Sequence, residues 1–272
     1  MARLKQLGHS VIPIERQLLL DTYALRRLFI RENPDYIFHL AAYGNMSSQK
    51  DEQEIFKANV IGTWNMLTSS KDIKYKAFIN MGSSSEYGKK DKPMSERDLP
   101  DADTFYGASK VAGTYLARAL AKQYDKPIMT VRPFSVYGPG EADFRFIPTI
   151  CKSLIKDEEM SVALNPYHDW TYIDDVIDGI MHLIKRSVNA SLYWYPVFNI
   201  GTNIEVSNAS VISFLERISG KKLKIKMGYM NNTADHWTAS NRKMQRLGFL
   251  PKVMLEKGLE KTYEYFQQRF KA

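Results

Sequence analysis

Short apolar runs alternate with longer amphipathic segments along most of the 272 residues. The runs at 36–41, 77–81, 128–133 and 198–201 are mostly apolar, which is typical of parallel strands that are buried on both faces. The segments between them carry apolar residues at helical spacing. Alternating strands and helices predict an α/β fold built on a doubly wound, Rossmann-type parallel sheet.

The amphipathic segments set the predicted helices. Residues 2–9 are predicted to be the last turns of a helix and residues 10–14 a strand. We expect Asp174 and Ser207 to cap the helices that follow them, and residues 160–164 to form a short strand. Further helices are predicted at 22–33, 51–70, 105–124, 149–157, 176–185, 208–218 and, with apolar positions from 255 to 270, at the end of the sequence.

Composition places the chain among globular proteins, with 44% hydrophobic and 25% charged residues. No apolar run approaches the ~18 residues of a membrane span, and the first residues hold no signal-peptide core. The single Cys151 excludes an intrachain disulfide and fits a reducing compartment, so a cytoplasmic location is predicted. The five histidines lack ligand spacing, so no metal site is predicted.

The net charge of +8 is compatible with nucleic acid, a membrane surface or a polyanionic small substrate as the partner. The only dense basic cluster lies at 221–226, where the alternation of lysines is typical of a strand with one solvated face. No RNA-binding motif occurs. We therefore predict neither a membrane nor a nucleic-acid partner.

Tyr106 and Lys110 are the strongest candidates for chemistry. They stand four apart at the start of the predicted helix 105–124, so their side chains project from one face. A nearby ammonium is expected to lower the pKa of the phenol and make Tyr106 a usable acid or base near neutral pH. Ser83, which follows the apolar run 77–81, can share the substrate oxygen with it. Such a pair alone is more often an exposed aromatic–cation contact, so the assignment depends on further motifs.

Those further motifs occur in one fixed order along the chain. They are His39–Ala42, Asn59–Thr63, Ser83–Gly88, Tyr106 with Lys110, Arg132–Pro139 and Asp169–Asp175. The ordered set resembles the extended short-chain dehydrogenase/reductase family, which includes nucleotide-sugar epimerases, dehydratases and ketoreductases, over essentially the whole chain. The resemblance implies Ser83, Tyr106 and Lys110 as catalytic residues and NAD or NADP as the cofactor.

The resemblance also implies a cofactor site. Glu15 falls where the family places the acid that binds the adenosine ribose, which favours NAD, whereas Arg16 could pair with a 2′-phosphate, which favours NADP. The two readings leave the choice open. The other predicted cofactor-binding residues are Leu40, Ala41, Ala42, Asn59, Tyr106 and Lys110.

The family's glycine-rich turn, which cradles the cofactor pyrophosphate, does not occur in the printed sequence, where Gly8 is the only glycine before Gly44. In the family, residues 10–14 would be the second strand and not the first. We expect either an N-terminally shortened chain or a protein that has lost normal dinucleotide binding. The chain as printed should then bind NAD(P) weakly and expose a strand edge.

Departures from the family narrow the expected chemistry. The 4,6-dehydratases follow the catalytic hydroxyl with an Asp and a Glu, but Ser84 and Ser85 stand here, and neither can act as a carboxylate base. Fucose-type epimerase-reductases carry a Cys and a His at the positions of Ser85 and Arg145. The remaining function is oxidoreduction or epimerisation at a carbinol or ketone carbon, assigned to C4, of a nucleotide-activated sugar. The short link at 17–21 slightly favours a 4-ketoreductase over a 4-epimerase.

The substrate site departs from the family as well. The diphosphate-binding Asn of the family is Ser135 here, and its Arg before Asp169 is His168, which weakens the anion site. Arg145, Lys152 or Arg242 could compensate. Glu86 either reaches the pocket or is a solvated loop acid. The predicted substrate-binding residues are Ser84, Ser85, Ser135, Arg145, His168 and Arg242.

The organisation of the chain follows from the same resemblance. Residues 1–140, re-entered by about 169–205, are predicted to form the cofactor domain, and residues 141–168 and 206–272 mainly a substrate-binding lobe and C-terminal helix. The family implies a homodimer through helices 51–70 and 105–124, although these apolar faces could equally be core. The alternative function is a cofactor-blind relative that binds RNA or regulates a partner, but such a protein would not need Ser83, Tyr106 and Lys110.

Overall fold

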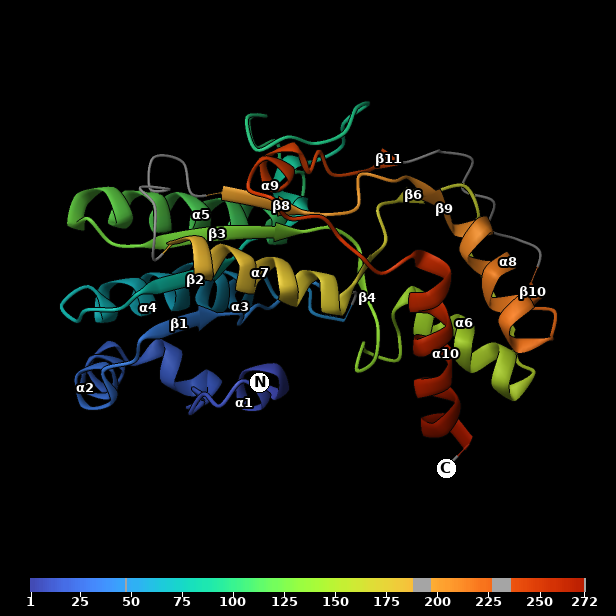
Figure 1. Cartoon of the computed structure of the whole chain (residues 1–272), viewed down its shortest axis with the longest axis horizontal. Coiled ribbons are helices and arrows are strands. Elements are labelled where there is room, and N and C mark those ends of the chain that lie inside the picture. The colour runs from blue at the N-terminus through green and yellow to red at the C-terminus, as the bar shows by residue number, and fades with distance from the viewer. Residues whose placement is uncertain (47, 188–196, 227–235, 272) are drawn as a thin grey trace.

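The computed structural model of the chain describes residues 1–46, 48–187, 197–226 and 236–271. Four parallel strands form the central sheet in the order β1–β2–β3–β8 (Figure 1). They are β1 (Tyr36–His39), β2 (Ala77–Met81), β3 (Ile128–Pro133) and β8 (Val197–Ile200). All four lie within or at the apolar runs, so the predicted parallel sheet is confirmed.

Successive side chains of the sheet face opposite helix layers. Phe78 and Ile128 pack in one core with α2 (Thr22–Glu32), α4 (Gly62–Ser70) and α5 (Phe105–Tyr124). Ile79 and Val131, their neighbours along the strands, pack in another with α7 (Ile173–Ser187) and α9 (Arg242–Arg246). Because both faces are covered, the doubly wound arrangement is confirmed.

The predicted helices at 51–70 and 105–124 both form. The first runs as α3 (Glu52–Phe56), a π-helical turn η2 (Lys57–Ile61) and α4, with Asp51 accepting the first free N–H groups. The second is α5, which Thr104 caps through Gly107 N at 3.0 Å. These two helices pack against each other beside the strands that carry the candidate chemistry.

The N-terminal segment differs from its prediction. Helix α1 (Ala2–Gln6) and the 3-10 turn η1 (Arg16–Leu20) flank an extended stretch, and residues 10–14 form no strand. An isolated extended segment lacks the ladder of hydrogen bonds that stabilises a strand. Among the described residues, no strand pairs with the outer edge of β1. The predicted strand at 10–14 is therefore wrong for this structure.

The remaining elements build a separate lobe around a core of its own. Figure 1 shows α6 (Phe146–Lys156), α8 (Asn208–Ser219) and α10 (Leu255–Lys271) together at one end of the molecule, away from α2 and α4. Ser207 caps α8 as predicted, through Ser210 N at 3.1 Å. Asp174 instead lies inside the first turn of α7, which begins one residue earlier, so its predicted capping role is wrong.

Short strands pair with one another outside the central sheet. The pairs are β4 (Val136–Tyr137) with β7 (Thr171–Tyr172), β5 (Glu159–Met160) with β10 (Lys224–Ile225), and β6 (Tyr167–His168) between β9 (Val206–Ser207) and β11 (His236–Trp237). The predicted strand 160–164 is largely wrong, because β5 overlaps it only at Met160 and residues 161–164 form no strand. No helix in the described ranges is long and apolar enough to cross a bilayer. The domain boundaries stay a prediction.

Candidate active site

Ser83 lies where β2 ends and the 3-10 helix η3 (Ser84–Tyr87) begins. Its hydroxyl accepts a hydrogen bond from Ser85 N at 3.1 Å, and Glu86 accepts one from Ser83 N at 2.9 Å, which makes a capping box. The sequence S-S-S-E thus folds the chain into a turn that holds the Ser83 side chain in place. In a parallel sheet, the carboxyl ends of the strands are where ligands bind.

Tyr106 and Lys110 project from the first two turns of α5 toward this turn. Lys110 is buried and Tyr106 is half-buried, because α5 approaches η3 closely: a Cβ built on Gly107 would lie 2.6 Å from the carbonyl oxygen of Ser85. A hydrogen bond joins the side chains of Ser83 and Tyr106. The three predicted catalytic residues are therefore brought together in one place.

The pKa of Tyr106 is raised above its ordinary value, which contradicts the predicted lowering by Lys110. Burial is the largest cause, and it outweighs the hydrogen bond with Ser83 and the charge of Arg145, which both lower the pKa. The error came from treating the phenol as fully solvated, whereas the structure removes much of it from water. Tyr106 is consequently held as an acid in this structure.

Lys110 is a buried cation that makes no hydrogen bond or ion pair with another described residue. Burial lowers the pKa of its ammonium to about 8, and the carboxylate of Glu86 acts in the opposite direction. Burial and the charge of Lys110 together lower the pKa of His39 to about 3, so this imidazole is neutral at pH 7. A buried ammonium without a partner calls for an oxygen-rich ligand.

Glu86 is neither a pocket acid nor a solvated loop acid, the two readings of the sequence. Its side chain is 0% exposed and pairs with Arg132 of β3, whose Nη2 donates to Glu86 Oε2 at 2.6 Å. The guanidinium also lies over the ring of Tyr87, at 4.5 Å from its centroid. Because Glu86 belongs to η3, this buried ion pair connects the turn at Ser83 to β3.

Asn59 sits on the π-helical turn, and its amide is engaged within the chain. Its Nδ2 donates to Tyr43 O at 2.7 Å and to Ser109 Oγ at 2.9 Å, while its Oδ1 accepts from Tyr43 N at 2.8 Å. These bonds tie the segment that follows β1 to α5. The structure thus gives Asn59 a positioning role, and its predicted contact with a cofactor stays a prediction.

The predicted cofactor residues of the N-terminal half lie along the outer side of the sheet. Leu40 and Ala42 are exposed just beyond β1, and Ala41 is half-buried. Glu15 and Arg16 are exposed at the start of η1, where Arg16 lies over Tyr43 and 3.5 Å from Glu54. The residues present therefore fit the nicotinamide end of a dinucleotide, around Lys110, better than its pyrophosphate.

The predicted substrate residues fall into three groups. Ser84 and Ser85 belong to the turn at Ser83. Ser135 Oγ and His168 Nδ1 lie 3.3 Å apart, so these two predicted substrate residues lie side by side. Arg145 precedes α6, reaches Asn45 O at 3.5 Å and acts on the pKa of Tyr106.

Arg242, also predicted to bind substrate, stands apart from these three groups: it is exposed at the start of α9, and within the described ranges it makes no hydrogen bond or ion pair with them. Two residues near the site carried no signal in the sequence. Trp237 Nε1 donates to Ser84 Oγ at 2.8 Å from 153 positions away, so only the fold could reveal this contact. Burial raises the pKa of Glu141, near Arg145, to about 7.

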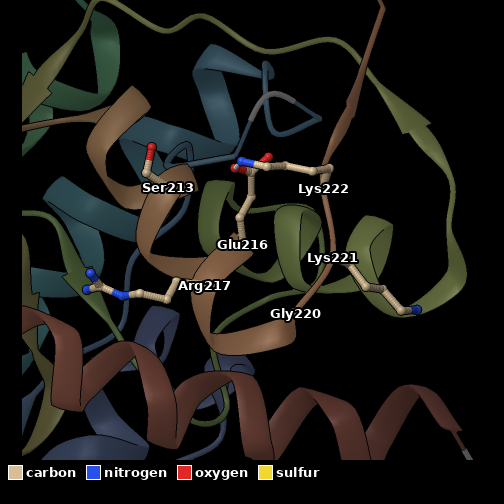
Figure 2. A pocket seen from close by; sticks show the side chains of 6 residues that line it. All are labelled: Ser213, Glu216, Arg217, Gly220, Lys221 and Lys222. Atoms are coloured by element: carbon tan, nitrogen blue, oxygen red, sulfur yellow. Dashed lines mark hydrogen bonds and ion pairs between the residues drawn. The ribbon is translucent and has the colours of Figure 1, made fainter.

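A surface cavity of about 320 Å³ lies away from this site, at the outer end of α8 (Figure 2). Its cations are already engaged: Lys222 pairs with Glu216, Arg217 pairs with Glu256, and Lys221 donates to Leu154 O. The described residues hold no group of three or more side chains suited to a metal ion. The chemistry of the chain is concentrated at Ser83, Tyr106 and Lys110.

Comparisons with known proteins agree with this geometry. The sequence model of the NAD dependent epimerase/dehydratase family matches residues 1–201. The chain is 30% identical to the uncharacterized protein MJ1055 of Methanocaldococcus jannaschii, over 85% of the chain and 72% of the relative. It is 24% identical to the human dTDP-D-glucose 4,6-dehydratase, over 92% and 73%.

A solved structure is similar over almost the whole chain. The UDP-glucuronic acid 4-epimerase of Bacillus cereus, in complex with UDP-glucuronic acid and NAD, superposes with a TM-score of 0.83 and 29% identity. The superposition covers 98% of this chain and 86% of the epimerase.

Proposed function

Because the chain belongs to the NAD-dependent epimerase/dehydratase family, we propose that it acts at C4 of a nucleotide-activated sugar with NAD as its cofactor, as a 4-epimerase. The observation that carries the proposal is the meeting of Ser83, Tyr106 and Lys110 at the carboxyl end of β2. The likeness to a 4-epimerase that binds NAD and UDP-glucuronic acid supports the choice of reaction.

The roles of the three side chains follow from their surroundings. The phenol of Tyr106, held as an acid by burial, is suited to protonate a C4 keto oxygen, and as phenolate it takes the proton from a C4 hydroxyl. The Ser83 hydroxyl, fixed by the capping box, orients the same oxygen. Bound NAD would accept the hydride from C4 and return it.

The residues that hold the cofactor follow from the same geometry. The ammonium of Lys110, which lacks a partner among the described residues, would bind ribose hydroxyls. Leu40, Ala41 and Ala42 would line the cofactor beside β1. Glu15 would bind the adenosine ribose, and because Arg16 already contacts Glu54 and Tyr43, NAD is favoured over NADP.

The nature of the turn at Ser83 argues against dehydration. Elimination of water needs a carboxylate base, whereas Ser84 is occupied by Trp237 and Ser85 carries only a hydroxyl. The sequence slightly favoured a 4-ketoreductase, and the comparisons give no support to that order. The reductase remains the second candidate, because the short link before α2 favours it and both reactions use the same three side chains.

Following one substrate separates the two reactions. The protein is incubated with NAD and UDP-glucuronic acid, then with UDP-glucose and dTDP-glucose, and the sugar products are identified by NMR while the absorbance of reduced nicotinamide is recorded. A 4-epimerase gives the C4 epimer without net change in reduced cofactor. A 4-ketoreductase instead consumes one NADH or NADPH for each 4-keto sugar. Absence of both reactions, with folded protein and saturating cofactor, would overturn the proposal.

We also propose a homodimer formed by the helices at 52–70 and 105–124. Six large apolar residues on these helices are exposed in the single chain, where water contact is unfavourable. They are Phe56, Ile61, Trp64, Phe105, Tyr115 and Tyr124. Light scattering should give about twice the 31.4 kDa of the chain, and Trp64→Glu with Tyr115→Glu should give the single mass.

A further inference from the structure

We propose that Glu86, held by its buried pair with Arg132, places both the turn at Ser83 and a fixed negative charge beside Lys110, which makes Glu86 a positioning residue. The inference rests on the proposed function for the roles of Ser83 and Lys110. Its basis is the geometry beneath the turn at Ser83, and its test is independent of any substrate.

The carboxylate of Glu86 joins two elements of the sheet. Its Oε1 accepts from Ser83 N at 2.9 Å, and its Oε2 accepts from Arg132 Nη2 at 2.6 Å. One oxygen therefore fixes the backbone of the turn after β2, and the other anchors that turn to β3. A side chain with both oxygens bound in this way determines where the Ser83 hydroxyl points.

The pair is closed to substrate. Glu86 and Arg132 are 0% and 1% exposed, and a Cβ built on Gly82 would lie 2.5 Å from Glu86 Oε1. Only glycine leaves room for the carboxylate against the backbone at that point. Because no ligand can reach Glu86 without displacing the turn, its effect on chemistry must pass through the residues that it holds.

Arg132 is fixed in turn by the scaffold behind it. Its guanidinium lies over Tyr87, whose hydroxyl donates to Asn199 Oδ1 at 2.7 Å on β8. Asn199 N donates to Glu96 Oε1 at 2.9 Å. A buried ion pair contributes little stability relative to apolar side chains of the same size. Placement of the turn is therefore a better explanation of the pair than stability.

The charge of Glu86 also reaches Lys110. Burial lowers the pKa of Lys110 to about 8, and Glu86 is the group that raises it again. Among the described residues, His39 of β1 also interacts with the charge of Lys110, and it is neutral at pH 7 because its pKa is about 3. Tyr106 lies one turn earlier on α5, and its pKa is raised. Removing the charge of Glu86 should therefore let Lys110 lose its proton at a lower pH.

The test is a titration of the lysine side chains by NMR, on protein labelled with ¹³C at lysine Cε, with the Lys110 signal assigned by Lys110→Met. Glu86→Gln keeps the size of the side chain and an acceptor for Ser83 N but removes the charge. We expect the titration midpoint of Lys110 to fall by about one pH unit. The matched control is Glu96→Gln, which removes another buried carboxylate of the same layer that does not contact Ser83.

Each result decides the inference. A fall in Glu86→Gln with no change in Glu96→Gln supports it, and an unchanged midpoint, or equal falls in both variants, overturns it. If Glu86→Gln leaves Arg132 unpaired and fails to fold, the double variant Glu86→Gln/Arg132→Met is titrated with the same criterion. Because the readout needs neither cofactor nor sugar, its failure would leave the proposed reaction standing, and a missing reaction would leave the titration valid.

Discussion

The inner strands β2 and β3 carry the candidate chemistry, whereas β1 is the outer described edge of the sheet, with residues 1–35 beyond it. Ile79 and Val131 of the inner strands are fully buried, but Ile12 and Leu40 on the outer side are 46% and 55% exposed. Inside, Ser83 N, Ser83 Oγ and Ser84 Oγ of the turn each have a defined partner. Outside, Glu15 and Arg16 meet only surface neighbours.

The difference separates two tasks of a dinucleotide enzyme. Proton transfer needs a few side chains held rigidly, and the inner region supplies them from the turn after β2 and from α5. Binding of the pyrophosphate needs several backbone N–H groups at a helix N-terminus, and the described residues before β1 present no glycine-rich turn of that kind. We therefore expect the 272-residue chain to hold its catalytic side chains in place but to bind NAD weakly.

The largest expected effect concerns the affinity for NAD. Hydrogen bonds to a charged group contribute roughly 1.5–3 kcal/mol each, so three missing donors correspond to about 4–9 kcal/mol. At about 1.4 kcal/mol for each factor of ten, a micromolar site becomes millimolar or weaker. Isothermal titration of the 272-residue chain should show this weak binding. Micromolar binding by this chain would show that other residues hold the pyrophosphate and would erase the contrast between the two regions.

Tyr106→Phe tests the inner region. Loss of the phenol should lower turnover by about 10²- to 10⁴-fold, the usual contribution of a positioned acid or base. The fold should persist, because the ring still fills its buried site. Tyr124→Phe, at the far end of α5, is the matched control and should retain full turnover. Near-normal turnover in Tyr106→Phe, measured on the sugar that the wild type converts, would contradict the assignment.

Matched substitutions at Ile79 and Ile12 compare how much the inner and the outer region contribute to the free energy of unfolding. Ile79→Ala removes a fully buried side chain from the core beneath α7, which should lower the free energy of unfolding by about 2–5 kcal/mol. Ile12→Ala removes a side chain that is already partly in water and should change it by about 0.5 kcal/mol or less. Urea unfolding of both variants gives the comparison. A large loss in Ile12→Ala would show that the outer segment is packed in solution.

The accuracy of the sequence predictions also differs between the inner and the outer region. The bounds of β3 and α5 were predicted correctly, because buried strands and a capped helix leave strong patterns. The run at 10–14 has the same apolar character, but strand formation depends on a neighbour that the pattern does not reveal. Local propensity therefore suffices where tertiary contacts agree with it.

For the candidate site, too, the sequence revealed the local features and missed those that depend on distant segments. Ser83, Tyr106 and Lys110 could be found because their spacing is local and their chemistry recognisable. The raised pKa of Tyr106 and the burial of Glu86 could not, because both depend on packing of distant segments. The predicted lowering by Lys110 assumed solvent that the fold excludes. Arg132 lay within a recognised motif, but only the structure shows that it pairs with Glu86.

Trp237 gives the smallest expected effect and tests how far the inner region extends into the lobe. Its indole N–H donates to Ser84 Oγ, while its ring packs against the cluster of Tyr87, Met94 and Phe134. Trp237→Phe keeps most of the apolar contact and removes one neutral hydrogen bond, which is worth about 1 kcal/mol. We therefore expect kcat/KM to fall by roughly fivefold, since about 1.4 kcal/mol corresponds to a factor of ten.

A double-mutant cycle with Ser84→Ala isolates this bond from the other contacts of the two residues. If the bond holds the turn at Ser83 against β11, the two substitutions together should cost no more than either one, and their coupling energy should be about 1 kcal/mol. The cycle is measured as kcat/KM on the converted sugar and as urea stability. Coupling in kcat/KM that exceeds the coupling in stability would place β11 in the active site, because a bond that only stabilises the fold acts on stability first. If the effects of Trp237→Phe and Ser84→Ala are strictly additive, β11 does not help to hold the turn at Ser83, and the inner region consists of the sheet and α5 alone.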